Sequence, residues 1–176
     1  VELANLMKAS DYNVTYLDCA QEPRNEGVRG KLRADIPVVS DLAELEKIVS
    51  EMGIDIIHSH HAWVDSSILD ILPEDTPCRT VVTLHGMYET INSVDLKFIL
   101  PRLARRSASL IYVADKNLMA LTQHKLVDKV RLVRIENALS DNGFDPIERA
   151  TLDIPEEAFV VTLISRAMEE KGWQEG

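Results

Sequence analysis

Short apolar runs rich in Val, Ile and Leu recur along this chain, and segments with helical patterning separate them. The runs cover residues 14–17, 54–57, 80–84, 110–113, 130–135 and 159–164. Most are apolar at every position rather than alternating with polar residues, which is typical of strands covered on both faces of a parallel sheet. The order strand, helix, strand, helix therefore predicts an α/β fold with a doubly wound parallel sheet flanked by helices.

Helix-forming patterns fill the spaces between these runs. Asp41 followed by Glu44 has the spacing of a capping box, and the apolar stripe after it ends at Gly53, a residue suited to a helix C-terminus. Further helices are expected at the N-terminus and over residues 64–72, 93–107 and 116–124, with an interruption at Pro101. The polar stretch of residues 18–36 is expected to be a long loop, either solvated or facing a ligand.

Composition excludes several classes of protein. A chain of 176 residues is long enough for one domain with its own core. Its net charge of −10 argues against a nucleic-acid partner, which would need a basic face. Cys19 and Cys78 lie far apart and form no disulfide framework, so a cytoplasmic location is expected. No apolar run approaches the roughly 20 residues that span a membrane.

The run over residues 82–86, Val-Thr-Leu-His-Gly, ends in a polar residue at the tip of a predicted strand. Strand tips are where α/β proteins place ligand-binding groups. His85 can donate a hydrogen bond or act as an acid or base near neutral pH, and Gly86, without a Cβ, lets a ligand approach the backbone. The alternative is a histidine satisfied within its own loop, and the dipeptide alone does not decide between the two.

A second group of histidines, His58, His60 and His61, follows the second apolar run. In extended backbone His58 and His60 face the same way, an arrangement found in metal sites. A metal-dependent hydrolase is therefore one hypothesis, with Asp55 or Asp65 as the carboxylate partner. The other interpretation, which we favour, is that these histidines are polar groups lining a cleft without a metal.

Polar residues also follow the last two predicted strands. Arg166 and Lys171 come shortly after the run at 159–164. Arg offers a bidentate fork for phosphate and Lys a mobile point charge, a pair that suits a diphosphate. On spacing alone, ion pairs with neighbouring glutamates are the simpler interpretation. Asn137, after the run at 130–135, is expected to hold a turn through side-chain to backbone hydrogen bonds.

In order and spacing, four stretches resemble the retaining GT-B glycosyltransferases, the large group that serves bacterial cell-surface polysaccharide and glycolipid synthesis. Residues 55–60, Asp-Ile-Ile-His-Ser-His, and residues 82–86 resemble two strands of the family's N-terminal domain. Residues 133–138, Val-Arg-Ile-Glu-Asn-Ala, resemble its Val-Ile-Pro-Asn-Gly-Val turn. Residues 163–173 resemble its Gly-Arg and Glu-Lys-Gly element. The resemblance spans essentially the whole chain.

The resemblance implies two Rossmann-like domains with a cleft between them, of which this chain holds the N-terminal, acceptor-side half. The substrates implied are a nucleotide-sugar donor and a saccharide or lipid-linked acceptor, with no metal cofactor. His85 would be the catalytic-site histidine that contacts the transferred sugar, while Arg166 and Lys171 would bind the donor diphosphate and stabilise its leaving charge. The acceptor side of the cleft would be lined by residues that follow two strands: His58, His60, His61 and Gly86.

The resemblance also predicts the domain organisation. Residues 1–140 would form the acceptor-side domain without its first strand and glycine-rich loop, residues 141–158 a linker, and residues 159–176 the start of a truncated donor domain. Ala138 and Ser165 stand where the family has glycine, so the turn and the phosphate approach are expected to differ. The donor domain's Glu-x7-Glu element is missing, and we expect the chain by itself to be inactive.

Other interpretations stay open at this point. One is the hydrolase, and another is a non-catalytic relative that binds a sugar or a partner through the same cleft. Arg102, Arg105 and Arg106 would either meet the inner face of a membrane or form a solvated helix face. The apolar run at 159–164 would join the sheet, pair with a second copy of the chain, or be disordered.

Overall fold

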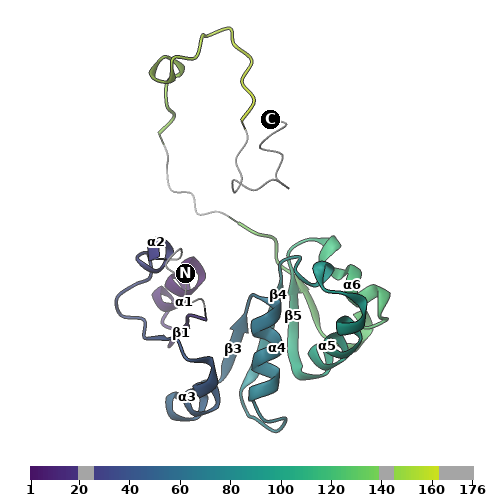
Figure 1. The fold of residues 1–176 in the computed structure, drawn as a ribbon. Coiled ribbons are helices and arrows are strands. Elements are labelled where there is room, and N and C mark those ends of the chain that lie inside the picture. Colours follow the sequence, from purple (N-terminus) through teal and green to yellow (C-terminus); the bar gives the residue numbers. More distant parts are fainter. Residues whose placement is uncertain (20–25, 139–144, 163–176) are drawn as a thin grey trace. The chain divides into compact units, whose positions relative to one another are not determined.

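The computed structural model describes residues 1–19, 26–138 and 145–162. The chain divides into two units, Val1–Asn137 and Ala138–Gly176, of which the first is compact (Figure 1). The predicted α/β class is confirmed, because parallel strands flanked by helices build the first unit. Of the helices in the described residues, none has the length and apolarity to cross a bilayer.

Two parallel sheets run through the first unit (Figure 1). The smaller sheet pairs β1 (Tyr16–Leu17) with β2 (Val38–Val39). The larger sheet has the order β3-β4-β5-β6, with strands at Ile56–Ser59, Arg79–Leu84, Ser107–Tyr112 and Leu132–Arg134. Because all four strands of the larger sheet are parallel, their carboxyl ends meet at one edge, where the loops that follow them come together.

Helices alternate with the strands. They are α1 (Glu2–Ala9), α2 (Glu26–Arg29), α3 (Leu45–Met52), α4 (Ala62–Ile71), α5 (Ser93–Arg106) and α6 (Met119–Gln123). The predicted C-terminal end of α3 is confirmed, and the predicted capping box before it is confirmed only for Asp41. Asp41 accepts a hydrogen bond from Ala43 N at 2.9 Å, and Gly53 ends the helix with a φ of +60°. Glu44, however, pairs with Lys47 at 3.0 Å.

The predicted interruption at Pro101 is wrong, because α5 continues through this residue. Asn92 caps the helix by accepting hydrogen bonds from the backbone N–H groups of Val94 and Asp95 at 3.1 and 3.0 Å. Leu100 and Leu103, on either side of the proline, are 1% and 0% exposed. Capping and burial together offset the backbone hydrogen bond that proline removes.

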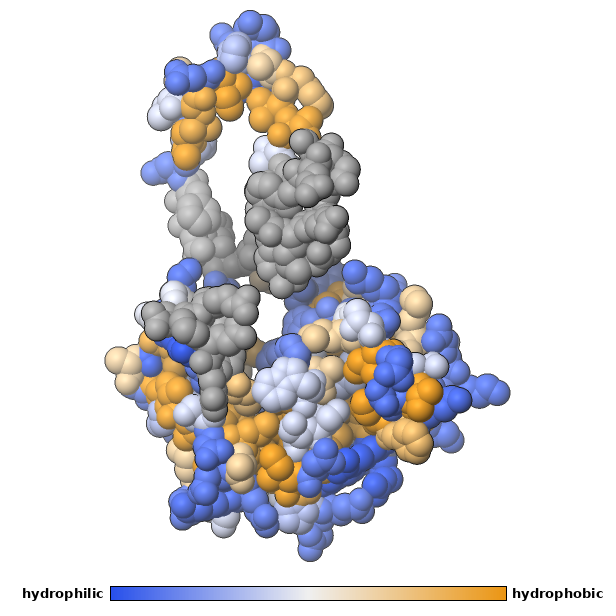
Figure 2. Space-filling view, viewed as in Figure 1, coloured by the Kyte–Doolittle hydropathy of each residue, from blue (hydrophilic) through white to orange (hydrophobic). Residues whose placement is uncertain are grey.

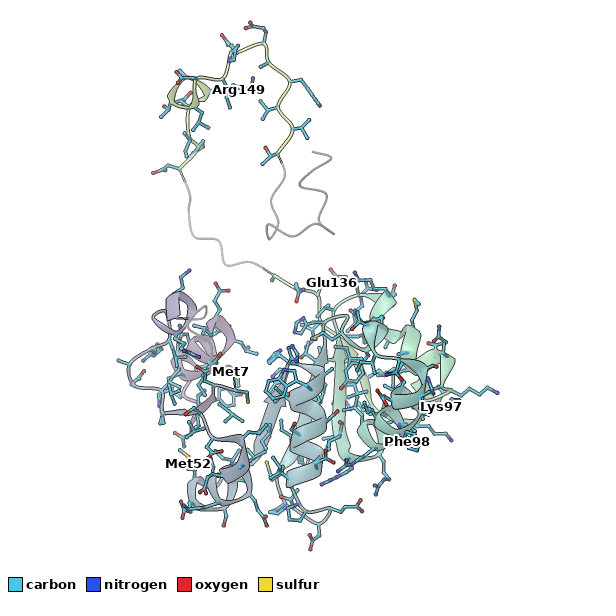
Figure 3. The ribbon with its side chains drawn as sticks, viewed as in Figure 1. Met7, Met52, Lys97, Phe98, Glu136 and Arg149 are labelled. Carbon is cyan, nitrogen blue, oxygen red and sulfur yellow. The ribbon has the colours of Figure 1, made fainter. Side chains whose placement is uncertain are left out.

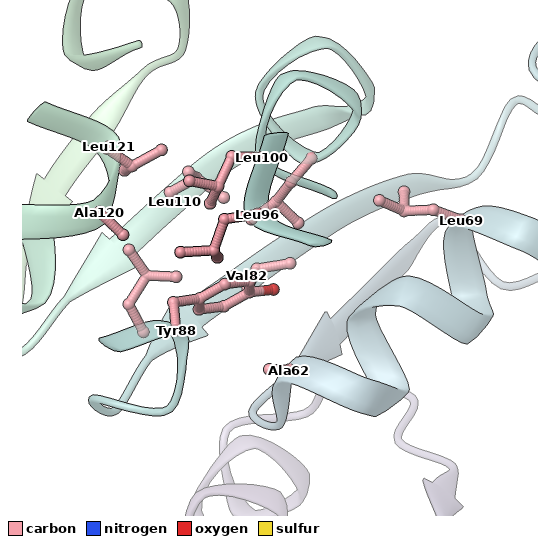
Figure 4. Close-up of a cluster of buried hydrophobic side chains, with 11 residues drawn as sticks. Ala62, Leu69, Val82, Tyr88, Leu96, Leu100, Leu110, Ala120 and Leu121 are labelled. Atoms are coloured by element: carbon pink, nitrogen blue, oxygen red, sulfur yellow. The ribbon is translucent and has the colours of Figure 1, made fainter. Parts of the chain in front are cut away.

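The main hydrophobic core joins α4, α5 and α6 to the central strands (Figure 4). Val82 and Leu110 lie in β4 and β5 and have no solvent-exposed surface. A second buried cluster, which includes Leu45, Val49 and Ile68, packs α3 against α4. Both cores therefore lie against the sheet and hold its central strands in place.

Two predicted boundaries need correction. Strand β3 covers Ile56–Ser59 rather than residues 54–57, because its pairing with β4 runs from Ile56 opposite Arg79 to Ser59 opposite Val82. His58 therefore belongs to the strand instead of following it. The stretch predicted as a loop over residues 18–36 contains α2 in its described part, and residues 20–25 lie outside the described ranges.

The side chain of Asn5 in α1 forms hydrogen bonds with the described part of residues 18–36. The Asn5 amide nitrogen donates to the carbonyl of Lys31 at 2.8 Å, and the Asn5 amide oxygen accepts from Arg33 N at 2.9 Å. One asparagine thus pairs with the backbone of the stretch in both directions. This contact gives the stretch a defined path, which its composition did not indicate.

The described part of the second unit contains a short 3-10 turn, η6 (Arg149–Leu152). The Arg149 guanidinium donates to the carbonyls of Pro155, Glu156 and Ala158 at 3.2, 2.8 and 2.9 Å. The strand predicted over 159–164 is wrong for residues 159–162, which form none, and residues 163–164 lie outside the described ranges. Phe159 and Val161 are 92% and 82% exposed, because no described strand lies beside them. Figure 2 shows hydrophobic surface on the described part of this unit.

Candidate active site at the carboxyl ends of the strands

Two loops meet where β3 and β4 end. Parallel pairing sets Ser59 opposite Val82, so the residues that follow Ser59 lie beside those that follow Leu84. Nδ1 of His60 and Nε2 of His85 are 3.2 Å apart, within hydrogen-bond distance. The rings of His58 and His60 face the same way, as predicted, with centroids 4.2 Å apart. The structure thus brings the two histidine groups of the sequence into one cluster, His58, His60 and His85.

A buried threonine that the sequence did not single out supports this cluster. Nε2 of His58 lies 2.8 Å from Oγ1 of Thr83, which stands on the neighbouring strand β4 and is 6% exposed. The signal was present but weak: a hydroxyl inside an otherwise apolar strand, shortly before His85. Thr83 fixes one ring nitrogen of His58 and so holds its ring against His60.

Packing lowers the pKa of two histidines of the cluster, His60 and His58. Partial burial, followed by the positive charges of His58 and His85, lowers the pKa of His60 to about 4. Burial, followed by the charge of His85, also lowers the pKa of His58. At pH 7 His60 is therefore neutral and offers one N–H donor and one lone pair. A neutral imidazole of this kind suits hydroxyl groups, which both donate and accept hydrogen bonds.

Gly86 is needed by the backbone itself. Its φ is +96°, and a Cβ at this position would meet Nδ2 of Asn117 at 3.4 Å and Oε2 of Glu89 at 3.8 Å. Asn117 is 2% exposed, and its amide oxygen accepts a hydrogen bond from Ala114 N at 3.0 Å. The loop after β5 therefore packs closely on the loop after β4. A role for Gly86 in letting a ligand approach stays a prediction.

The structure gives fewer contacts for the remaining predicted site residues, and two of them lie outside its described part. His61 lies next to the cluster, with its ring edge toward Trp63 and centroids 5.7 Å apart. Asn137 is exposed and follows β6, beyond Glu136 at the same edge of the sheet (Figure 3). Arg166 and Lys171 lie outside the described residues, so their predicted contact with a diphosphate stays a prediction.

Comparison with known proteins assigns the chain to a family. The model of glycosyltransferase family 4 matches residues 1–142, which include both sheets and the histidine cluster. The chain belongs to glycosyltransferase family 4. No curated protein and no solved structure matched it. Its family 4 membership agrees with the observed α/β fold and supports a transferase that uses a sugar donor and an acceptor.

Family 4 membership does not favour the hydrolase hypothesis. Within residues 1–19, 26–138 and 145–162, no group of three or more His, Cys, Asp or Glu side chains is arranged to hold a metal ion. Asp65, one of the two carboxylates suggested as a metal partner, accepts a hydrogen bond from the Tyr88 hydroxyl at 2.7 Å. One oxygen of Asp65 is therefore already used within the protein, and the metal-free interpretation of the histidines stays a prediction.

The arginines of α5 form hydrogen bonds with carboxylate and carbonyl oxygens of this family 4 domain. Arg102 contacts Asp70 and the carbonyl of Leu69, and Arg105 forms two hydrogen bonds with Glu74 at 2.9 and 2.7 Å. Arg106 donates to three carbonyls at the end of α4: those of Leu69, Leu72 and Pro73. These contacts explain the cluster of arginines without a membrane, and any membrane contact stays a prediction.

Proposed function

We propose that this family 4 chain is the acceptor-side domain of a retaining GT-B hexosyltransferase. The enzyme would move a sugar from a nucleotide-sugar donor to a saccharide or lipid-linked acceptor. The observation that carries the proposal is the pair His60 and His85, whose ring nitrogens lie 3.2 Å apart across two strand tips. Groups held this way at the carboxyl edge of a parallel sheet are placed for ligand binding.

His85 is the residue we propose to touch the transferred sugar. Its Nε2 is engaged with His60, so its Nδ1 is the atom left to meet a sugar hydroxyl. In the tautomer in which His60 donates, Nδ1 of His85 carries the proton and donates to the sugar. His58 and His60 within this cluster, with His61 and Gly86 beside it, would form the acceptor side.

Charge on the leaving diphosphate is the main electrostatic demand of the reaction. As the sugar departs with oxocarbenium character, negative charge builds on the diphosphate, and cations aimed at it lower the barrier. Arg166 and Lys171 are the residues we propose for this task, and no metal is required in the scheme. Asn137 would shape the turn beside the cleft.

The proposed organisation assigns residues 1–140 to the acceptor-side domain, 141–158 to a linker and 159–176 to the start of the donor domain. The intact enzyme would act in the cytoplasm, on surface polysaccharide or glycolipid precursors at the inner face of the membrane. The exposed apolar residues 159–162 would be a contact for a second copy of the chain.

The first test is the coding sequence beyond Gly176, where we expect a Glu-x7-Glu element within the donor domain. The second is a thermal-shift panel of nucleotide sugars on the intact protein, followed by a transfer assay. His85→Ala should lower kcat about 100-fold, as expected for a lost group that acts in the transition state. His124→Ala, a histidine outside the cluster, serves as the matched control and should keep the wild-type rate.

The outcomes separate the candidate functions. Stabilisation by a nucleotide sugar with transfer that depends on His85 supports the proposal. Donor binding without transfer would replace it with the non-catalytic sugar-binding relative. Equal rates for His85→Ala and His124→Ala would remove His85 from the catalytic site.

A further inference from the structure

Buried polar side-chain atoms gather behind the histidine cluster. Three of them belong to the segment that leads from β3 into α4: Ser59 Oγ, His61 Nδ1 and Asp65 Oδ1. Ser59 and His61 both lower the pKa of Asp65, so the polar groups of this segment are arranged around that carboxyl group. The segment is the one that carries His60.

Asp65 is the charged member of this group. It lies in α4 and is 1% exposed, and its backbone N–H donates to the carbonyl of His61 at 2.9 Å. Oδ2 of Asp65 accepts a hydrogen bond of 2.7 Å from the hydroxyl of Tyr88, in the 3-10 turn η3 (Tyr88–Thr90) shortly after His85. The Tyr88 ring packs in the main core, with its hydroxyl directed toward α4 (Figure 4).

The two loops of the site are therefore joined twice. One link is the contact between the ring nitrogens of His60 and His85, and the other is the buried hydrogen bond from Tyr88 to Asp65. Burial raises the pKa of Tyr88, and the charge of Asp65 raises it further, so the phenol keeps its proton and remains a donor. A hydrogen bond to a carboxylate is stronger in such a water-poor setting than at the surface.

We propose that Asp65 is a positioning residue that, through Tyr88, fixes the loop carrying His85 against the loop carrying His60. The proposal rests on the proposed function, because the geometry it fixes is that of the sugar-contacting histidine. Asp65 does not touch substrate. Without the bond to Tyr88, one of the two described hydrogen-bonded links between these loops is lost, and misplacement by about 1 Å costs on the order of a hundredfold in rate.

Three variants and one control test this role. Tyr88→Phe keeps the ring in the core and removes only the donor, Asp65→Ala removes the acceptor, and Asp65→Asn retains an acceptor oxygen. Tyr12→Phe makes the same chemical change at a tyrosine that is 56% exposed. One readout is the set of ring ¹⁵N signals of His60 and His85 in the 176-residue chain. The other is kcat and KM of sugar transfer in the intact protein.

We expect Tyr88→Phe and Asp65→Ala to shift the ring signals of both histidines and to lower kcat about 10- to 100-fold. The KM for the donor should change less than about threefold, because in the proposed scheme Arg166 and Lys171 hold its diphosphate away from this cluster. Asp65→Asn should recover most of the rate, and Tyr12→Phe should resemble the wild type in both readouts.

Unchanged ring signals in folded Tyr88→Phe would overturn the proposal, and so would an Asp65→Asn variant as impaired as Asp65→Ala. Tyr88→Phe carries the test if Asp65→Ala does not fold. The ring signals need no turnover. Signals that shift in an intact protein with no transferase activity would therefore refute the proposed function and leave the positioning role standing.

Discussion

The two edges of the larger sheet treat their polar groups in opposite ways. At the amino edge, Arg102, Arg105 and Arg106 are all engaged with acceptors on or after α4. At the carboxyl edge, burial lowers the pKa of His60 and of His58, and His61 Nδ1 is a buried atom with no hydrogen-bond partner among the described residues. The amino edge also has one such atom, Ser107 Oγ, but its charged side chains are paired with each other, whereas the carboxyl edge gathers weakly basic imidazoles.

The difference follows from what each set of groups does for the fold. Arg102 and Arg106 donate to carbonyls at the C-terminal end of α4, which every helix leaves unpaired, and they complement the negative end of the helix dipole. The histidine cluster follows two strands and is held by Thr83 and by its own rings. Charge at the amino edge therefore contributes stability, whereas neutral groups at the carboxyl edge remain able to bind a ligand.

The largest expected effect tests the amino edge. Arg106→Met keeps much of the apolar stem but removes the hydrogen bonds to the carbonyls of Leu72 and Pro73, of which Pro73 still accepts from Thr76 N. Loss of these bonds to partly buried carbonyls should cost about 2–3 kcal/mol of unfolding free energy, measured by urea denaturation. Ring ¹⁵N signals of His60 and His85 should stay at their wild-type positions. A shift of those signals would mean that the two edges are coupled, and the contrast would fail.

The next effect belongs to the carboxyl edge. Gly86→Ala forces a Cβ onto a residue with φ of +96° and toward Asn117, which should cost about 1–2 kcal/mol and displace the loop after His85. Gly53→Ala is the matched control, because φ is +60° there and the space around its Cβ is open. Both should lower the thermal midpoint, but only Gly86→Ala should move the histidine signals. Equal responses would place Gly86 outside the site.

A smaller effect concerns pH. The pKa of His60 falls from 6.5 to about 4 on folding, so below pH 6.5 the unfolded chain binds a proton that the folded chain refuses. Stability should therefore fall as the pH drops from 6.5 toward 4. The raised pKa of Asp65 acts with the opposite slope. The difference between wild type and His60→Gln, followed by urea midpoints across this range, isolates the histidine, because Asp65 contributes to both.

Removing His60 should flatten the pH dependence of stability. Parallel curves for wild type and His60→Gln would show that the histidine cluster is open to water and binds protons freely. The neutral character assigned to the carboxyl edge would then be wrong.

The smallest effect returns to the amino edge. Arg105→Ala breaks an exposed ion pair with Glu74, and exposed pairs contribute less than about 1 kcal/mol. Urea denaturation of Arg105→Ala beside Arg106→Met measures how much of the amino edge is charge pairing and how much is capping of carbonyls. A loss for Arg105→Ala as large as that for Arg106→Met would contradict the capping argument.

Local sequence patterns predicted much of the fold. The apolar runs predicted β4 closely, and they predicted β3, β5 and β6 with ends that differ from the observed ones. Gly53 marked the end of α3. Strand β2 was missed because two residues leave no period to detect. The run at 159–164 was read as a strand because its composition is strand-like, but a strand also needs a partner for its backbone groups.

The sequence predicted the histidines of the site but not the residues that hold them in place. His58 and His60 share a face because successive strand residues alternate, and this period is written in the sequence. Thr83, Asn117 and Tyr88 looked like ordinary strand and loop residues. Their importance comes from what the parallel register and the packing of η3 place beside them.

By itself the sequence determined the α/β class, the alternation of strands and helices, and the residue types available at each strand tip. These depend on period, composition and chain connectivity, which are local properties. Only the tertiary structure decided that His60 meets His85, that Asp65 lies behind them against Tyr88, and that the arginines of α5 bind the end of α4. Such pairings join residues that are distant along the chain, and they exist only once the strands have taken their register and the helices have packed.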